Sequence, residues 1–146
     1  MTVIQNPSLP KHKIKFLLLE GISDSAVQIL TGAGYENVVC LKTALDGDAL
    51  KAALQGVRVL GIRSRTQMTA EMLAATSSLM AVGCFSVGTN QIDLDAARYK
   101  GVPVFNAPFS NTRSVAELTI AEIVMLFRRT FPRSAAAHRG PGKNPP

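Results

Sequence analysis

The stretch Leu79-Met-Ala-Val-Gly-Cys-Phe-Ser-Val-Gly-Thr-Asn-Gln-Ile-Asp93, near the middle of the chain, decides the fold. Its apolar run 79–84 is typical of a buried strand, and the polar loop behind this run leads into a predicted helix over 93–100. The apolar run 102–105 repeats the plan, since a second polar loop and a helix follow it. Loops that leave a strand and enter a helix form the ligand sites of α/β proteins. This arrangement therefore predicts a ligand site at the carboxyl ends of the strands.

The same strand-and-helix unit recurs along the whole chain. Strands are predicted over the apolar runs 14–20, 38–41, 57–62, 79–84 and 102–105. Helices are predicted over 23–34, 46–55, 69–76, 93–100 and 114–131. Regular alternation of this kind requires parallel strands, right-handed crossovers and helices on both faces. The predicted fold class is α/β, a flavodoxin-like doubly wound parallel sheet of five strands.

Composition restricts the class of protein. With 146 residues, of which 47% are hydrophobic, the chain is long enough for one compact domain with its own core. It has no apolar run of membrane-spanning length and no signal-peptide order at its amino terminus, which indicates a soluble, cytoplasmic protein. Cys40 and Cys84 lie in apolar, strand-like runs, so we expect two reduced, buried thiols and no metal site.

The net charge of +6 raises the question of nucleic-acid binding. Residues 1–123 contain 11 Lys and Arg against 10 Asp and Glu. The remaining excess lies in a tail, at Arg128, Arg129, Arg133, Arg139 and Lys143. A nucleic-acid surface needs basic residues clustered on a folded element or aromatic rings for stacking, and this tail has neither. Nucleic-acid binding, with its steep salt dependence, is the least favoured alternative.

Two arginines directly follow the third predicted strand, in Arg63-Ser-Arg-Thr66. Their guanidinium groups would lie at the carboxyl edge of the sheet, and such groups suit phosphate and carboxylate oxygens. Lys42, just past the second strand, lies at the same edge and would add a third positive charge. The alternative is that these side chains are solvated or pair with Asp or Glu.

The loop 86–90 contains Gly88, which would let a ligand approach main-chain N–H groups that donate to an anion. The alternative is an ordinary β–α turn, in which the glycine meets only a backbone requirement. A polar group follows the fifth strand: Asn106, Ser110, Asn111 and Thr112. These side chains either contact a ligand or form turns and cap a helix.

No set of nucleophile and base can be assembled. The only histidines, His12 and His138, lie away from the predicted strand ends, and Asp93 and Asp95 are expected to cap the fourth helix. The sequence lacks G-x-x-x-x-G-K-[ST] and G-x-G-x-x-G, and Gly32-Ala-Gly34 ends a helix instead of opening one. By its own residues the chain is expected to bind an anion without catalysis.

The fifth predicted helix, 114–131, begins with a capping box, Ser114-Val-Ala-Glu117. Its residues are apolar nearly all round, which is typical of a helix buried on several sides. Nothing later in the chain would cover it fully. We therefore expect a second subunit or another domain to do so.

Three runs resemble a known family: Gly61-Ile-Arg-Ser-Arg-Thr66, Ala81-Val-Gly-Cys-Phe-Ser-Val-Gly-Thr-Asn-Gln-Ile-Asp93 and Gly101-Val-Pro-Val-Phe-Asn-Ala-Pro-Phe-Ser-Asn-Thr-Arg-Ser-Val-Ala-Glu117. They are similar to the amino-terminal portion of the D-isomer-specific 2-hydroxyacid dehydrogenases, and among these to the phosphoglycerate dehydrogenases. The resemblance runs from about Lys13 to Gly140. It implies an NAD-dependent oxidoreductase of serine biosynthesis that oxidises the C2 hydroxyl of 3-phosphoglycerate to 3-phosphohydroxypyruvate.

The resemblance also implies roles for individual residues. Arg63, Ser64 and Arg65 match the substrate-anion loop of the family, and Lys42 matches a lysine near the phosphate. Val87 and Gly88 match the loop whose N–H groups hold the substrate carboxylate, and Asn111 matches an asparagine near the substrate and the nicotinamide. The family's NAD loop and its catalytic arginine, glutamate and histidine have no counterparts in this sequence. No catalytic residue is assigned, and tight binding of NAD is not expected.

The implied organisation is a flexible leader over 1–12, a substrate-binding lobe over 13–108, a linker and the first helix of a cofactor domain over 109–131, and an irregular tail over 132–146. The chain is expected to be a truncated or fragmentary dehydrogenase that binds a phosphorylated small hydroxyacid. In the family the helix 114–131 helps to form the dimer interface, so a homo-oligomer or pairing with a full-length subunit is expected. The alternative is a non-catalytic anion-binding or regulatory module that pairs with a full-length dehydrogenase.

Overall fold

The structure, a computed structural model, describes residues 9–140. The chain divides after Pro108 into two compact units. The first unit contains a sheet and its connecting helices, and the second contains two further helices. Residues 1–8 of the predicted leader and 141–146 of the predicted tail lie outside the described residues.

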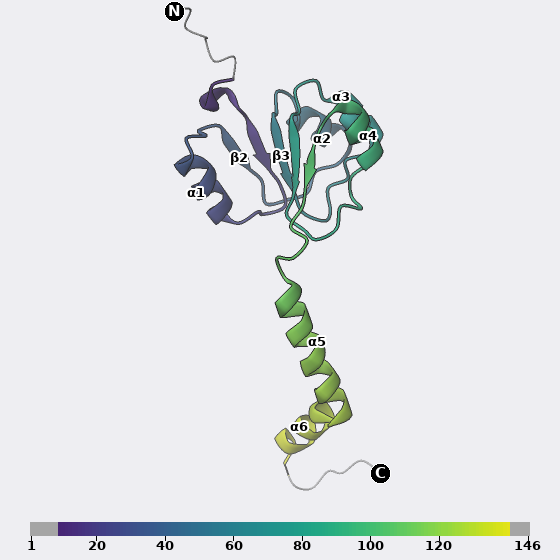
Figure 1. Cartoon of the computed structure of the whole chain (residues 1–146). Helices are drawn as coiled ribbons and strands as arrows, with labels where there is room; N and C mark the ends of the chain where they lie inside the picture. The colour runs from purple at the N-terminus through teal and green to yellow at the C-terminus, as the bar shows by residue number, and fades with distance from the viewer. Residues whose placement is uncertain (1–8, 141–146) are drawn as a thin grey trace, which may run out of the picture. The chain divides into compact units, whose positions relative to one another are not determined.

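The first unit is built on a parallel five-stranded sheet (Figure 1). In spatial order, its strands are β2 (Val38–Cys40), β1 (Phe16–Leu18), β3 (Val59–Ile62), β4 (Ala81–Cys84) and β5 (Val104–Phe105). This order confirms the predicted doubly wound α/β sheet. Each strand is shorter than the apolar run that predicts it. After β1, for example, the chain turns at Glu20 and Gly21, which both have positive φ angles, 63° and 64°.

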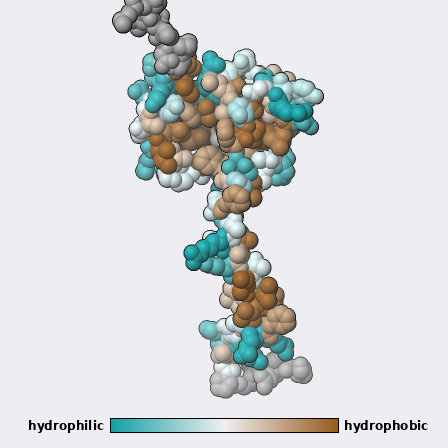
Figure 2. All heavy atoms as spheres, viewed as in Figure 1, coloured by the Kyte–Doolittle hydropathy of each residue, from teal (hydrophilic) through white to brown (hydrophobic). Residues whose placement is uncertain are grey.

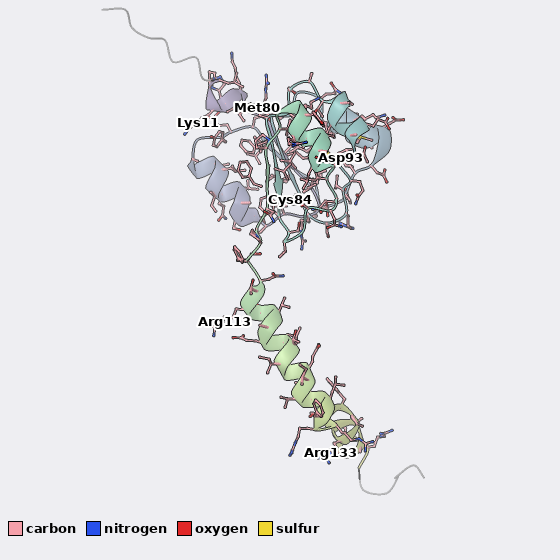
Figure 3. All side chains as sticks on the ribbon, turned by 45° about the vertical axis from the view of Figure 1, so that its right-hand side comes forward. Lys11, Met80, Cys84, Asp93, Arg113 and Arg133 are labelled. Atoms are coloured by element: carbon pink, nitrogen blue, oxygen red, sulfur yellow. The ribbon has the colours of Figure 1, made fainter. Side chains whose placement is uncertain are left out.

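Four helices connect these strands: α1 (Asp24–Gly32), α2 (Gly47–Ala53), α3 (Ala70–Ala75) and α4 (Leu94–Lys100). The step from β1 to β2 crosses the sheet in one direction and the later steps cross it in the other. Right-handed crossovers therefore place α1 on one face and α2, α3 and α4 on the opposite face. Ser23, Thr69 and Asp93 cap α1, α3 and α4 with their side-chain oxygens (Asp93 is labelled in Figure 3). Asp95 lies inside the first turn of α4 and does not cap it.

The main core lies between the sheet and α2, α3 and α4. Side chains alternate along a strand, and Leu17, Leu60 and Val82 belong to the face that is almost fully buried in this core. The opposite face, with Phe16 and Gly61, is covered only in part by α1, which leaves an apolar hollow of about 310 Å³. The sheet is thus sealed on one face and partly open on the other.

Two smaller predictions for the first unit are wrong. The predicted flexible leader, 1–12, is wrong only at its described end, which enters a 3-10 helix, η1 (Lys11–Lys13), anchored because the Lys11 ammonium donates to the Ala33 carbonyl oxygen at 2.7 Å. Both cysteines are unpaired, as expected, but Cys40 is exposed because β2 is an edge strand. Cys84 is buried in the core, and burial raises the pKa of its thiol.

The second unit consists of α5 (Thr112–Phe127) and α6 (Thr130–His138). The prediction of one helix over 114–131 that begins with a capping box is wrong. Ser114 lies inside α5, and the Glu117 carboxylate does not cap but accepts a hydrogen bond from Arg113 Nε at 2.7 Å. At the other end, Arg129 has a left-handed φ of 53°, which separates α5 from α6.

The predicted irregular tail is also wrong for its described part, since α6 continues to His138. Pro132 lies in the first turn of α6, where a backbone N–H would have no intrahelical acceptor, so its ring does not interrupt the helix. The alanines 135–137 then favour helix strongly. Neither these helices nor any other within residues 9–140 is long and apolar enough to cross a membrane.

Candidate functional site

The candidate site lies where β3 and β4 end side by side. Ile62 pairs with Cys84 in the parallel register, and the N–H of Phe85 donates to the Ile62 carbonyl oxygen at 2.7 Å. The arginine loop (residues 63–66) and the glycine loop (residues 86–90) therefore leave the same edge of the sheet at the same level. The fold brings these two sequence-predicted loops together.

A buried carboxylate holds the arginine loop. The Glu20 side chain is 2% exposed, and its two oxygens accept every backbone N–H of the loop at 2.9–3.2 Å: those of Arg63, Ser64, Arg65 and Thr66. Glu20 also has a positive φ, which is costly for a residue other than glycine, and these hydrogen bonds offset that cost. The N–H groups of the loop thus converge on the Glu20 carboxylate, as the N–H groups of a backbone nest converge on a bound anion.

Burial and hydrogen bonding act in opposite directions on Glu20. Burial raises the pKa of this carboxyl, but the N–H groups of Thr66, Arg65 and Arg63 outweigh burial and hold the pKa below its ordinary value. The buried Thr66 hydroxyl adds to the lowering, although its geometry falls short of a full hydrogen bond. Glu20 is therefore a carboxylate at neutral pH.

Sequence reasoning assigned no role to Glu20. A signal was present, because a charged residue closes the apolar run 14–20 directly before Gly21. Its partners, however, lie 43 to 46 positions further along the chain. Only the pairing of β1 with β3 brings the carboxylate to the loop.

The two arginine side chains of this loop are exposed. The Arg65 side chain is 64% exposed, and its Nε lies 3.7 Å from Glu20 Oε2, a long contact that agrees with the alternative of pairing with an acid. Arg63 forms no ion pair within residues 9–140. Because Glu20 already uses the N–H groups of the loop, an anion here has to be bound by the guanidinium groups or by the Ser64 hydroxyl.

In the glycine loop, unlike the arginine loop, carbonyl groups rather than N–H groups form the hydrogen bonds. Its carbonyl groups are used: Asn106 Nδ2 donates to the Val87 oxygen at 2.7 Å, and Ser86 Oγ donates to the Gly88 oxygen at 2.8 Å. The N–H groups of Val87 and Gly88 have no acceptor in the part of the chain that the structure describes, and both residues are exposed. These N–H groups are available to a ligand carboxylate.

Two further sequence-predicted residues lie outside these loops. Lys42 lines a groove of about 530 Å³ together with Gly21 and Ser23, at the ends of β1 and β2. Its ammonium makes no ion pair among the described residues. Asn111 belongs to the second unit, where it precedes α5 without a side-chain cap. In the first unit the candidate site therefore consists of the two loops. Lys42 follows β2, which is separated from β3 by β1 in the sheet.

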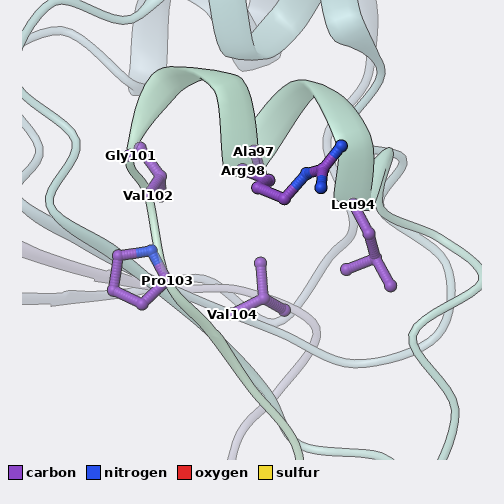
Figure 4. A pocket seen from close by; sticks show the side chains of 7 residues that line it. All are labelled: Leu94, Ala97, Arg98, Gly101, Val102, Pro103 and Val104. Carbon is purple, nitrogen blue, oxygen red and sulfur yellow. The ribbon is translucent and has the colours of Figure 1, made fainter.

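Another groove, of about 460 Å³, lies between α4 and the start of β5 (Figure 4). Its lining is mainly apolar, includes Leu94 and Val104, and has Arg98 as its single charged residue. Neither loop contributes to it, so it is not assigned as the anion site. Within residues 9–140 there is also no group of three or more His, Cys, Asp or Glu that could hold a metal ion.

Comparison with known proteins shows the family. The model for the catalytic domain of D-isomer-specific 2-hydroxyacid dehydrogenases matches residues 16–138. The chain belongs to this family. Members of the D-isomer-specific 2-hydroxyacid dehydrogenase family are NAD-dependent oxidoreductases, and the resemblance found in the sequence is confirmed.

Relatives within the family are close in sequence. The chain is 57% identical over 133 residues to D-3-phosphoglycerate dehydrogenase of Haemophilus influenzae, which covers 91% of this chain and 32% of that protein. It is 53% identical, with the same coverage, to D-3-phosphoglycerate dehydrogenase of Escherichia coli K12. The chain thus spans about a third of the length of these curated relatives.

Solved structures share the fold. The TT0316 protein of Thermus thermophilus matches with a TM-score of 0.77 and 28% identity, over 91% of this chain and 43% of that chain. D-lactate dehydrogenase of Aquifex aeolicus, solved with NAD and lactic acid, matches with a TM-score of 0.69 and 21% identity, over 88% of this chain and 39% of that chain. The parallel sheet described above is therefore shared with these two solved structures.

Proposed function

We propose that this chain supplies the substrate-anion site of a phosphoglycerate dehydrogenase, which oxidises the C2 hydroxyl of 3-phosphoglycerate with NAD to give 3-phosphohydroxypyruvate in serine biosynthesis. The observation that carries the proposal is the pair of loops at the ends of β3 and β4. One presents the arginines 63 and 65, and the other presents the free N–H groups of Val87 and Gly88. A substrate with a phosphate and a carboxylate needs two anion sites of this kind. The 57% identity to the Haemophilus influenzae enzyme supports this choice of substrate.

Each residue has a role in this proposal. Arg63, Ser64 and Arg65 bind one anionic group of the substrate, and the Val87 and Gly88 N–H groups bind the other. Lys42 adds positive charge near the phosphate, and Asn111 contacts the substrate and the nicotinamide in the assembled enzyme. Residues 13–108 form the substrate-binding lobe, and 109–131 begin the cofactor domain.

NAD would supply the hydride acceptor of the reaction. The 146 residues do not contain the G-x-G-x-x-G loop that cradles a dinucleotide, and we do not expect them to bind NAD tightly by themselves. The proposal therefore assigns anion binding to these residues and no step of hydride transfer.

For the purified 146-residue polypeptide we expect binding of 3-phosphoglycerate without NAD-dependent turnover. Calorimetry would compare 3-phosphoglycerate with inorganic phosphate and with D-glycerate, which each carry one of its two anionic groups. Because only 3-phosphoglycerate engages both loops, it is expected to bind about tenfold more tightly than either, a difference of about 1.4 kcal/mol. Equal affinities would contradict a two-anion site, and measurable turnover would contradict the restriction to anion binding.

A second candidate function, pairing with another dehydrogenase subunit or with a second copy of the chain, is favoured by α5. Its residues Ile120, Val124 and Phe127 recur at helical spacing and are 64%, 54% and 85% exposed. Figure 2 shows hydrophobic residues at the surface along this helix. Exposed apolar surface of this extent is typical of an interaction site.

Pairing through α5 predicts that Ile123→Glu, in the same apolar stripe, converts an oligomer into a monomer, because a charge would be buried in the interface. Size-exclusion chromatography with light scattering would measure the mass of each form. Ser114→Glu, an equal change of charge at an exposed position on the opposite side of the same helix from Ile123, is the matched control. A wild-type chain that is already monomeric, or a control that dissociates equally, would rule out pairing through this face.

A further inference from the structure

Gln91 connects the two loops of the candidate site. Its side chain is buried, and its Nε2 donates to the Arg63 carbonyl oxygen at 2.5 Å and to Ser86 Oγ at 3.1 Å. The Arg63 carbonyl can only accept, so the nitrogen of the Gln91 amide has to face it. Both hydrogens of one NH₂ group are thus used, one on each loop.

The planar amide makes this connection rigid. Its two N–H bonds diverge at a fixed angle, so the two acceptors are held at a fixed separation. The Ser86 hydroxyl links Gln91 to the glycine loop, because it also donates its own hydrogen to the Gly88 carbonyl oxygen at 2.8 Å. The backbone of Gln91 is itself anchored, since the Met68 N–H donates to its carbonyl oxygen at 2.8 Å.

Glu20 and Gln91 hold the arginine loop in complementary ways. The Glu20 carboxylate accepts hydrogen bonds from the N–H groups of the loop, and the Gln91 amide donates one to the Arg63 carbonyl oxygen. Only Gln91 also reaches the glycine loop. It is therefore the side chain that relates the position of one loop to the position of the other.

We propose that Gln91 is a positioning residue which sets the spacing between the guanidinium groups of the arginine loop and the N–H groups of Val87 and Gly88, and so selects ligands with two anionic groups over ligands with one. The inference rests on the proposed function and deepens it. A residue that only stabilised the fold would affect both kinds of ligand alike. A residue that sets the spacing between the two loops affects only a ligand that contacts both of them.

The test uses Gln91→Met, which keeps the length of the side chain and removes both donors. Calorimetry with the 146-residue chain would measure the affinities for 3-phosphoglycerate and for inorganic phosphate. We expect the affinity for 3-phosphoglycerate to fall about tenfold and the affinity for inorganic phosphate to stay unchanged, so that the preference is lost. Gln28→Met, at an exposed position of α1, is the matched control and should keep the preference.

Ser86→Ala provides a second variant, because it breaks the same connection at a half-buried residue and removes only one hydroxyl. It is expected to reduce the preference in the same direction, and it decides the question if Gln91→Met does not fold. A wild-type chain without preference would overturn the proposed function and this inference together. A wild-type preference that persists in the folded variants would overturn this inference alone.

Discussion

Glu20→Gln is expected to lower the free energy of unfolding by about 3 kcal/mol at neutral pH, because it removes the charge that pairs with four main-chain donors. An amide keeps one acceptor oxygen but turns an NH₂ group toward N–H groups of the arginine loop, which leaves buried or partly buried donors without partners. The positive φ of residue 20 would remain without the bonds that offset it. Chemical denaturation of the two forms measures the difference.

The effect should depend on pH in a defined direction. The pKa of Glu20 in the folded protein lies below its ordinary value, which is about 4.3 in an unfolded chain. The stabilisation by the carboxylate is therefore complete above about pH 4.3, and it is lost as the pH falls further, through the pKa of the folded state. The wild-type protein and the variant should converge in stability in this acid range.

Glu71→Gln is the matched control for this prediction. Glu71 forms an ion pair with Lys51 at 2.6 Å, but its side chain is 73% exposed. Exposed ion pairs contribute little to stability, so this variant should unfold nearly as the wild-type protein does. Equal stability of Glu20→Gln and the wild-type protein at neutral pH would show that the arginine loop does not depend on the carboxylate.

The combined change Arg63→Ala and Arg65→Ala is expected to weaken the binding of 3-phosphoglycerate by about tenfold, because the variant keeps only one of the two anion sites. A hydrogen bond to a charged group contributes about 1.5 kcal/mol or more, and 1.4 kcal/mol corresponds to tenfold in affinity. Arg63→Ala alone should leave stability unchanged, because this side chain has no ion-pair partner among residues 9–140. Arg65→Ala also removes the long contact with Glu20.

A control of equal charge separates a specific site from general electrostatic attraction. Arg98→Ala combined with Arg113→Ala also removes two positive charges, from exposed side chains of α4 and α5. This control should bind 3-phosphoglycerate as the wild-type chain does. If both double variants lose affinity equally in calorimetry, the arginine loop is not a specific site.

The alternation of apolar runs and helix signals was sufficient to predict the sheet. Strands buried on both faces read as continuous apolar runs, and parallel pairing with right-handed crossovers leaves few other arrangements. Loop residues that follow such runs, such as Arg63 and Gly88, could therefore be placed at the carboxyl edge. Strand ends were less predictable, because a run such as 14–20 continues into the turn after β1, where Glu20 has a positive φ.

The helices after β5 were predicted less well, for a local reason. The predicted helix ended at residue 131, directly before Pro132, but a proline in a first turn costs no hydrogen bond, and α6 includes it. The left-handed Arg129 that separates α5 from α6 leaves no pattern in the sequence. The Arg113–Glu117 pair does have a sequence signal, because opposite charges four residues apart pair on a helix, but Glu117 was assigned to the predicted capping box.

The sequence by itself determined the fold class, the family and the two loops, because each depends on residues that are close together along the chain. Only the tertiary structure decided how the loops are held. Glu20 lies 43 to 46 positions along the chain from the N–H groups that donate to it. Gln91 lies 28 positions along the chain from the Arg63 carbonyl to which it donates. Such contacts form only once parallel strands bring distant segments to one edge, where a buried polar group has to find partners or be excluded from the core.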